Sequence, residues 1–269
     1  MNSPIKQLVV VLLLSCMGGA AFSQEGGNGP MSLFMTYRCP IEKRAAFREH
    51  AADALVSQFE TWKQQKIFAD YLMLFSSFVN TGETAPDMVV RLDFARYVDI
   101  QRWKAIERTF PAGLSPRALQ LCAPVTSDLV DLSSSGGPAK TRNLTKAIYL
   151  WIPYHLERGV GKPQYKEYFE GYVKPQADGW LADGALSWWG MYLNQHNTGK
   201  PWDIMLLLEY ADIDGLARRD VVKQEVRARL RNDPAWKKLN DNKQEFRQED
   251  QVIIMDPILP AAAHSAVAQ

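Results

Sequence analysis

The sequence has few of the residues that most often carry chemistry: its 269 residues include 3 cysteines and 4 histidines. No histidine stands in a His-Glu-x-x-His pattern and no paired-cysteine spacing is present, so we expect no bound metal. Gly-x-Ser-x-Gly, P-loop and glycine-rich dinucleotide motifs are also missing. These absences disfavour serine hydrolases and nucleotide-dependent enzymes, and no motif predicts a cofactor.

The sequence also lacks an excess of charge of one sign. Lys and Arg together number 31 against 30 Asp and Glu, and they form no basic tract interleaved with aromatic residues. We therefore do not expect nucleic acid as a partner. After residue 23 no apolar run approaches the roughly 20 residues that a membrane-spanning helix needs, so no membrane span is predicted.

Residues 1–23 have the layout of a secretory signal peptide, with Lys6, an apolar run over Leu8–Leu14 and small residues at the end. A serine and two glycines interrupt the run, which disfavours a membrane anchor. A lipoprotein lipidated at Cys16 is the less favoured alternative. We expect a periplasmic or secreted protein, with a flexible segment over 24–30 and a disordered tail over 257–269.

The chain contains one matching block twice. An Asn-Thr-Gly turn at 80–82 precedes the apolar run 88–95, and the same turn at 197–199 precedes the run 204–211. A Ser/Gly/Pro stretch between the two blocks is typical of a linker. We therefore predict two repeats joined by a linker, at 31–132, 133–144 and 145–256.

Both repeats predict the same order of elements. In the first we expect strands at 33–37, 71–79, 88–94 and 127–132, with helices over 41–66 and from Val98. In the second we expect strands at 147–152, 185–193, 204–210 and 251–255, with helices over 163–181 and from Ile213. The order βαββαβ is that of a ferredoxin-like unit. Several strands lack apolar/polar alternation, which indicates that both faces of each sheet are covered.

Two such units packed sheet to sheet resemble the dimeric α/β barrel superfamily, here with both halves in one polypeptide. The resemblance rests on the element order, the Asn-Thr-Gly turns and the aspartate that leads each third strand. It implies an α+β fold of two tandem ferredoxin-like units. Members of this superfamily include cofactor-free monooxygenases, isomerases, haem-binding proteins and binders without catalysis, so the resemblance does not select a function. It also leaves the oligomeric state open.

In a sheet of this order the fourth strand runs antiparallel beside the first. Cys39 follows the predicted first strand and Cys122 precedes the predicted fourth strand. We therefore predict a disulfide bond between them, which an oxidising compartment would favour. Two separate buried thiols are the alternative.

The second repeat is rich in Tyr and Trp where the first uses Phe. Because Tyr and Trp carry a polar group that needs a partner when buried, this difference favours a pocket for an aromatic or lipophilic molecule. The predicted ligand-binding residues are Tyr149, Trp151, Tyr168, Tyr172, Trp188 and Trp189. For those on the helix, an ordinary core stripe is the alternative.

Charged residues on two strands form a second candidate site. Alternation places Arg91 and Asp93 of the first repeat, and Glu209 of the second, between the two sheets. A buried carboxylate pair, with Arg91 holding one carboxylate, is the functional interpretation, and a structural ion pair is the alternative. His155, expected just beyond a strand, and His50, on the first helix, are candidates for a base or a haem ligand.

These observations support a small-molecule binding protein with its pocket in the second repeat as the first interpretation. The alternative is an enzyme of the barrel type, either a cofactor-free monooxygenase or isomerase, or a haem protein. A purely structural role is a third interpretation. The sequence leaves open whether the chain is an enzyme.

Overall fold

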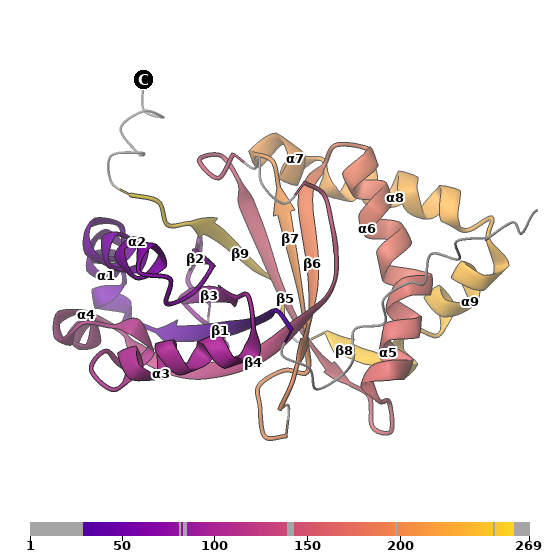
Figure 1. Ribbon diagram of the computed structural model, residues 1–269. Helices are drawn as coiled ribbons and strands as arrows, with labels where there is room; N and C mark the ends of the chain where they lie inside the picture. Colours follow the sequence, from indigo (N-terminus) through magenta and orange to yellow (C-terminus); the bar gives the residue numbers. More distant parts are fainter. Residues whose placement is uncertain are drawn as a thin grey trace, which may run out of the picture.

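The computed structural model describes residues 29–80, 82, 85–138, 143–196, 198–249 and 251–260. Figure 1 shows two groups of helices on either side of a central set of strands. The first half contains β1 (Met31–Arg38), α1 (Arg44–His50), α2 (Val56–Gln64), β2 (Asp70–Ser76), β3 (Met88–Phe94), α3 (Ile100–Glu107), α4 (Pro116–Leu121) and β4 (Ala123–Gly136). The second half contains β5 (Ile148–Leu156), α5 (Lys162–Tyr168), α6 (Lys174–Ala182), β6 (Leu186–Asn194), β7 (Ile204–Tyr210), α7 (Ile213–Ala217), α8 (Arg219–Leu230), α9 (Pro234–Asp241), β8 (Arg247–Glu249) and β9 (Ile253–Pro257).

The long first helix predicted for each half is one continuous helix with a π-helical turn in its middle. Ala51–Leu55 joins α1 to α2, and Phe169–Val173 joins α5 to α6. Short 3-10 turns lie at Ile41–Lys43, Tyr97–Asp99, Pro111–Gly113 and Lys243–Glu245. The two halves therefore share a local irregularity as well as an element order.

Each half pairs its strands as a ferredoxin-like sheet does. In the first half β1 lies between β3 and β4, and β2 borders β3. In the second half β5 lies between β7 and β9, and β6 borders β7. Ser32 is opposite Asp93 and Tyr149 is opposite Glu209, so these two pairs occupy corresponding positions. The third strands, β3 and β7, have the bounds predicted from the sequence.

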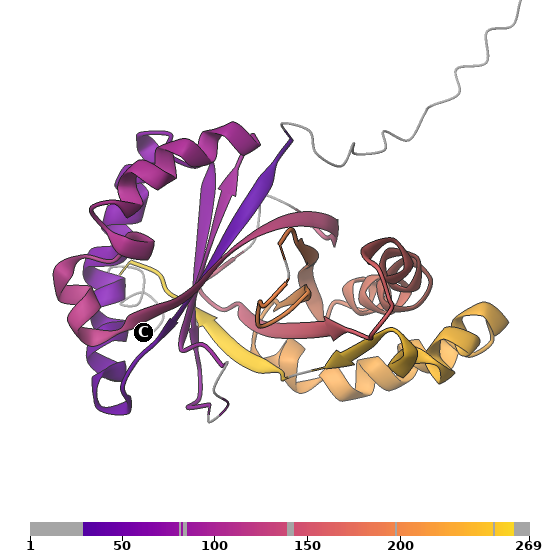
Figure 2. The same ribbon diagram turned by 90° about the horizontal axis from the view of Figure 1, so that it is seen from below.

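Two further antiparallel pairings close the sheets into a barrel: β4 pairs with β6, and β2 pairs with β9. The result is an antiparallel barrel of 8 strands with helices outside it. This is the dimeric α/β barrel fold that the sequence predicts. In Figure 2 the barrel strands run between the two groups of helices.

The strands bury both faces, each against a different layer. Their outward side chains pack on helices, as Leu33 and Val90 do in the first half and Leu206 does in the second. Their inward side chains alternate with these and form a third core inside the barrel, which includes Phe34 and Leu207. Burial on both faces explains why the strands lack clean apolar/polar alternation.

Cys39 and Cys122 form the predicted disulfide bond, with their Cα atoms 4.2 Å apart. Arg38 at the end of β1 pairs with Ala123 at the start of β4, and each is next in sequence to one cysteine. Strand pairing therefore brings the two cysteines together, as the ferredoxin-like order implies.

Two predicted boundaries differ in the structure. The linker was expected to begin at residue 133, but β4 continues to Gly136 because Ser134–Gly136 pair with β6. The disordered tail was expected from residue 257, but Pro257 pairs with Leu74 of β2 and Ile258 is buried in the first-half core. In both cases a partner strand from the other half orders the segment.

Residues 1–28 and 261–269 lie outside the described residues, and with them the predicted signal peptide, most of the segment 24–30 and the end of the tail. Within the described part of the chain, no helix combines the length and apolar character needed to cross a bilayer.

Candidate functional site

Aromatic rings from both halves fill the middle of the barrel. Phe34 on β1 makes edge-to-face contacts with Trp151 on β5 and Tyr192 on β6, at centroid distances of 5.0 and 4.9 Å. Trp202, just before β7, contacts Trp151 at 6.1 Å. All four rings are buried. The centre of the barrel is thus a packed core, and its polar groups lie toward the two ends.

Toward one end of the barrel, Arg91 of β3 links the two halves. Its Nη2 lies 2.9 Å from Oδ2 of Asp93, two residues along the same strand. Its Nη1 donates a hydrogen bond of 2.9 Å to the hydroxyl of Tyr192, which belongs to the second half. Ser32 of β1 donates to Oδ1 of Asp93 over 2.6 Å. The structure therefore brings together the Arg91–Asp93 pair predicted from the sequence.

Glu209 of β7 corresponds in position to Asp93 but has its own set of partners. The hydroxyl of Tyr149, opposite it on β5, donates a short hydrogen bond to Oε2. Ser187 Oγ donates to Oε1 over 2.7 Å. We call the following residues the barrel network: Ser32, Arg91, Asp93, Tyr149, Ser187, Tyr192 and Glu209.

Trp188 lies against the barrel network. The centroid of its ring is 5.9 Å from Cζ of Arg91. The register of β6 and β7 shifts between Leu186 and Trp188, and this bulge turns Trp188 into the barrel while Trp189 faces the helices. Gly190 leaves room for the indole, since a Cβ at this position would lie 2.8 Å from Cζ2 of Trp188. A bulge and a glycine thus place the indole beside Arg91.

The barrel network holds one cation and two carboxylates in surroundings that exclude most water. Glu209 is 1 % exposed and Arg91 is 6 % exposed, whereas the side chain of Asp93 is 30 % exposed. Burial acts to lower the pKa of Arg91, but the neighbouring Tyr192, Asp93 and Tyr149 outweigh it and raise that pKa. A buried carboxylate can take up a proton, and a permanent cation in the same network can stabilise an anion that forms.

The opposite end of the barrel carries a separate ion pair. Lys200, in the connection between β6 and β7, places Nζ 2.9 Å from Oδ1 of Asp128 on β4. The side chain of Asp128 is 0 % exposed. At the end with the barrel network, the hydroxyl groups of four residues contact the charged side chains: Ser32, Tyr149, Ser187 and Tyr192.

The aromatic residues predicted to bind a ligand separate into two groups. Tyr149, Trp151 and Trp188 face the barrel interior, whereas Tyr168, Tyr172 and Trp189 face the helices. In the helix layer, Tyr168 stacks on Phe246 with centroids 4.5 Å apart, and Tyr172 packs on Trp236 at 5.2 Å. The sheet separates the two groups, so one small ligand cannot touch all six residues.

Arg247 of β8, which the sequence analysis does not single out, lies at the edge of the helix layer. Its guanidinium is 3.9 Å from the ring centroid of Tyr154, and its Nε donates to the hydroxyl of Tyr168 over 3.3 Å. Burial raises the pKa of Tyr154 to about 12, although Arg247 acts to lower it. This group ties the short strand β8 to β5 and α5.

The two candidate histidines, His155 and His50, lie in different surroundings. His155 was expected in a loop but belongs to β5, because it pairs with Gln248 of β8. Its Nδ1 is 3.6 Å from Oδ2 of Asp203, and its side chain is 37 % exposed. The pKa of His50 is lowered, first by burial and then by Arg117. Its Nε2 is buried and has no hydrogen-bond partner among the described residues.

Within the described ranges, no three His, Cys, Asp or Glu side chains lie close enough together to hold a metal ion.

Sequence reasoning missed Tyr192, Ser187 and Ser32 as members of the barrel network. Tyr192 could have been found, because Trp188, Gly190 and Tyr192 alternate along one face of β6. The two serines gave no signal, since only the strand register shows which carboxylate each one reaches.

Comparisons with known proteins show likeness in structure alone. No protein-family model matches the chain, and no curated protein matches its sequence. A mutant chlorite dismutase from Candidatus Nitrospira defluvii is 10 % identical, with a TM-score of 0.49 over 90 % of this chain and 97 % of that one. A haem-binding protein from Thermus thermophilus is 13 % identical, with a TM-score of 0.47 over 89 % of this chain and 95 % of that one. Likeness this remote says nothing about function.

Proposed function

We propose that the chain is an enzyme that moves a proton on a small organic molecule bound at the barrel network, without a cofactor. This is the isomerase form of the alternative that the sequence raises. The observation that carries it is the buried carboxylate of Glu209, bonded to the hydroxyls of Tyr149 and Ser187, in the same barrel end as Arg91. A base, hydroxyl groups and a permanent cation are the parts that such a reaction needs.

The stability of the fold does not explain why charged side chains lie in the barrel network. Moving an ion out of water costs several kcal/mol, and apolar residues of similar volume often serve stability as well or better. Arg91 lies opposite Phe34 of β1, and Leu207 lies opposite Trp151 of β5. Leu207 is therefore the counterpart of Arg91 in the second half. Since the second half fills this position with a buried leucine, the barrel fold does not require an arginine there.

Glu209, Tyr192 and Arg91 have roles in the proposed reaction. Glu209 takes a proton from a carbon next to a carbonyl group: the C–H bond breaks, an O–H bond forms on the carboxyl, and the electron pair moves onto the carbonyl oxygen. Tyr192, whose hydroxyl accepts a hydrogen bond from Arg91, stabilises that negative oxygen. Returning the proton to the substrate restores the carboxylate, so no further reactant is needed.

The surroundings define the class of substrate. Trp188 and the two network tyrosines supply flat apolar surfaces, and Arg91 together with two carboxylates leaves the site with one net negative charge. An uncharged aromatic ketone or enol fits these surroundings better than a carboxylate does. Because Glu209 is 1 % exposed, we infer that Trp188 moves aside to admit the substrate.

Hydrogen–deuterium exchange of enolisable ketones tests this function. In D2O, proton NMR follows the loss of the α-C–H signal of 1-indanone and 2-tetralone with and without the protein. We expect the wild-type protein to accelerate exchange, and Glu209→Gln to lower that acceleration about 100-fold, because a positioned base contributes on the order of 10² to 10⁴.

Glu249→Gln is the matched control, because Glu249 is a 49 % exposed carboxylate in the same half. It should keep the wild-type rate. The proposal fails if Glu209→Gln exchanges as fast as the wild-type protein, or if the wild-type protein accelerates neither ketone over buffer.

A further inference from the structure

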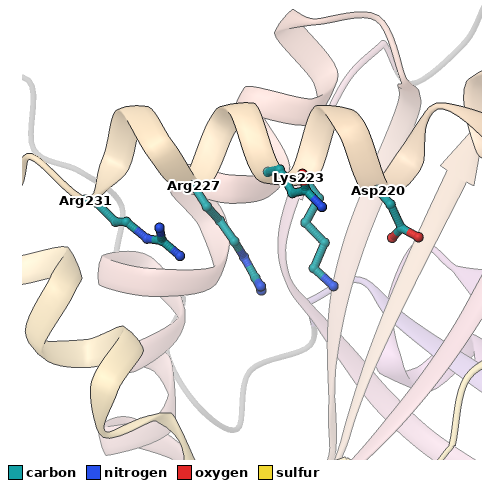
Figure 3. Close-up of a pocket in the computed structure, with 5 residues that line it drawn as sticks. Asp220, Lys223, Arg227 and Arg231 are labelled. Atoms are coloured by element: carbon teal, nitrogen blue, oxygen red, sulfur yellow. The ribbon is translucent and has the colours of Figure 1, made fainter.

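Outside the barrel, helix α8 lines a pocket of about 540 Å³ with a cationic wall. The pocket is lined by Asp220, Lys223, Gln224, Arg227 and Arg231. The three cations follow one another at intervals of four residues, so they lie along one face of α8 and its C-terminal end. Figure 3 shows their side chains extending from the helix into the same space.

Among the described residues none of the three cations of this pocket forms an ion pair, although Asp220 and Glu249 act electrostatically on Lys223, and Arg231 acts on Asp241. Lys223 and Arg231 make no side-chain hydrogen bond or ion pair there, and the only hydrogen bond of the Arg227 side chain goes to the neutral Gln176. The acidic residue of the pocket, Asp220, is 3.2 Å from Nη1 of Arg219 and is therefore already engaged.

Two other cations on the helices of the second half form ion pairs, unlike the cations of this pocket. On α8 itself, Arg229 places Nη2 2.6 Å from Oδ2 of Asp183, which follows α6. Lys174 lies 2.7 Å from Asp178 on α6. Cations on α6 and α8 can thus form ion pairs with nearby carboxylates, but the three cations of the pocket do not.

Arg227 is held in place by a buried amide. Its Nε donates to Oε1 of Gln176 over 2.8 Å, and Gln176 is 2 % exposed. Gln176 in turn donates from Nε2 to the backbone oxygen of Tyr172 over 2.8 Å. Because only Nε is used, the two Nη groups keep their donors for a ligand.

Neighbouring positive charges also affect Lys223. Its pKa is lowered, first by burial and then by Arg227 and Arg219. Like charges four residues apart on a helix repel each other and destabilise the helix. An anion placed among the three side chains would remove this repulsion.

We propose that the α8 pocket binds a small polyanion bearing two or more phosphate or carboxylate groups. Lys223, Arg227 and Arg231 contact its anionic groups, and Gln176 positions Arg227. From residue 223 to residue 231 the helix rises about 12 Å, so a molecule with two separated charges engages all three cations and a single small anion does not. This site is independent of the barrel network and of the function proposed for it.

Isothermal titration calorimetry with pyrophosphate and citrate tests the proposal on the whole protein. We expect both to bind at least tenfold more tightly than orthophosphate, and the stronger of the two identifies phosphate or carboxylate as the preferred group. Lys223→Gln and Arg231→Gln should each weaken binding about tenfold, the equivalent of 1.4 kcal/mol. Arg227→Lys, which keeps the charge but loses the planar fork that Gln176 holds, should weaken it by a smaller factor.

Lys238→Gln is the charge-matched control, because Lys238 is exposed on α9 and does not line the pocket. It should leave both affinities unchanged, and thermal unfolding of each variant verifies that the protein is folded. The proposal is overturned if neither polyanion binds the wild-type protein at millimolar concentration. It is also overturned if Lys238→Gln weakens binding as much as Lys223→Gln does.

Discussion

Removal of the disulfide bond should destabilise the whole barrel by an amount that the loop length predicts. The bond joins residues 83 apart in sequence and encloses β2, β3 and the helices of the first half. Closing a loop of this length removes unfolded-state entropy worth about 4.5 kcal/mol at 25 °C. Both cysteines are buried in the first-half core, so alanines at these positions also leave a small packing defect.

We therefore expect the Cys39→Ala/Cys122→Ala protein to lose about 4 to 5 kcal/mol of unfolding free energy. For a chain of this size each kcal/mol lowers the melting temperature by about 2 to 4 °C, which predicts a drop of about 8 to 20 °C. Because β4 pairs with β6 and β2 pairs with β9, the loss should appear in one transition of the whole molecule.

Urea unfolding followed by tryptophan fluorescence measures the difference in unfolding free energy between the wild-type protein and the double variant. Wild-type protein with its disulfide reduced is a second form without the bond. Reduced wild-type protein and the double variant should unfold at closely similar urea concentrations. If the oxidised protein offers two thiols to alkylation, the bond is absent. If the double variant lies within about 1 kcal/mol of the wild-type protein, the loop-entropy reasoning is wrong.

Four further predictions follow from the same contacts. Tyr192→Phe removes the hydroxyl that Arg91 Nη1 contacts, so it should cost about 1.5 to 3 kcal/mol in urea unfolding; no loss would contradict a hydrogen bond between the halves. Gly190→Ala collides with the Trp188 indole, so it should cost about 1 to 3 kcal/mol and shift tryptophan emission; unchanged emission would mean that the indole lies elsewhere. Burial raises the pKa of Tyr154 and Tyr210 to about 12, above the value of about 10 for tyrosine in the unfolded chain. Their contribution to the free energy of unfolding is therefore complete below pH 10 and is lost as the pH rises toward 12. Absorbance at 295 nm should show their ionisation together with unfolding. Export with cleavage after residue 23 predicts an intact mass beginning at residue 24, whereas a lipidated start at Cys16 would favour the lipoprotein alternative.

The sequence predicted the fold because the fold follows from local patterns and element order. The two Asn-Thr-Gly turns and the apolar runs after them identified β3 and β7 to the residue. Strand order then implied which ends meet, and the Cys39–Cys122 bond confirms that inference. The bounds of the linker and the tail differ at 133–136 and 257–258, because Ser/Gly/Pro composition indicated a linker and Ala/Pro composition a tail, while a strand from the other half orders both segments.

The candidate site was only partly predictable. Alternation placed Arg91, Asp93 and Glu209 inside the barrel, because period-2 alternation holds along an unbroken strand. It failed to separate Trp188 from Trp189, since a bulge before Trp188 decides which of the two faces inward.

The sequence by itself therefore determined the two ferredoxin-like units, their order and the disulfide, since each depends on neighbours in the chain or on strand order. Only the tertiary structure decided that Arg91 meets Tyr192 across the halves, and that Lys223, Arg227 and Arg231 form no ion pair among the described residues. The physical reason is that contacts between distant segments depend on register and barrel closure, which no local pattern in the sequence encodes.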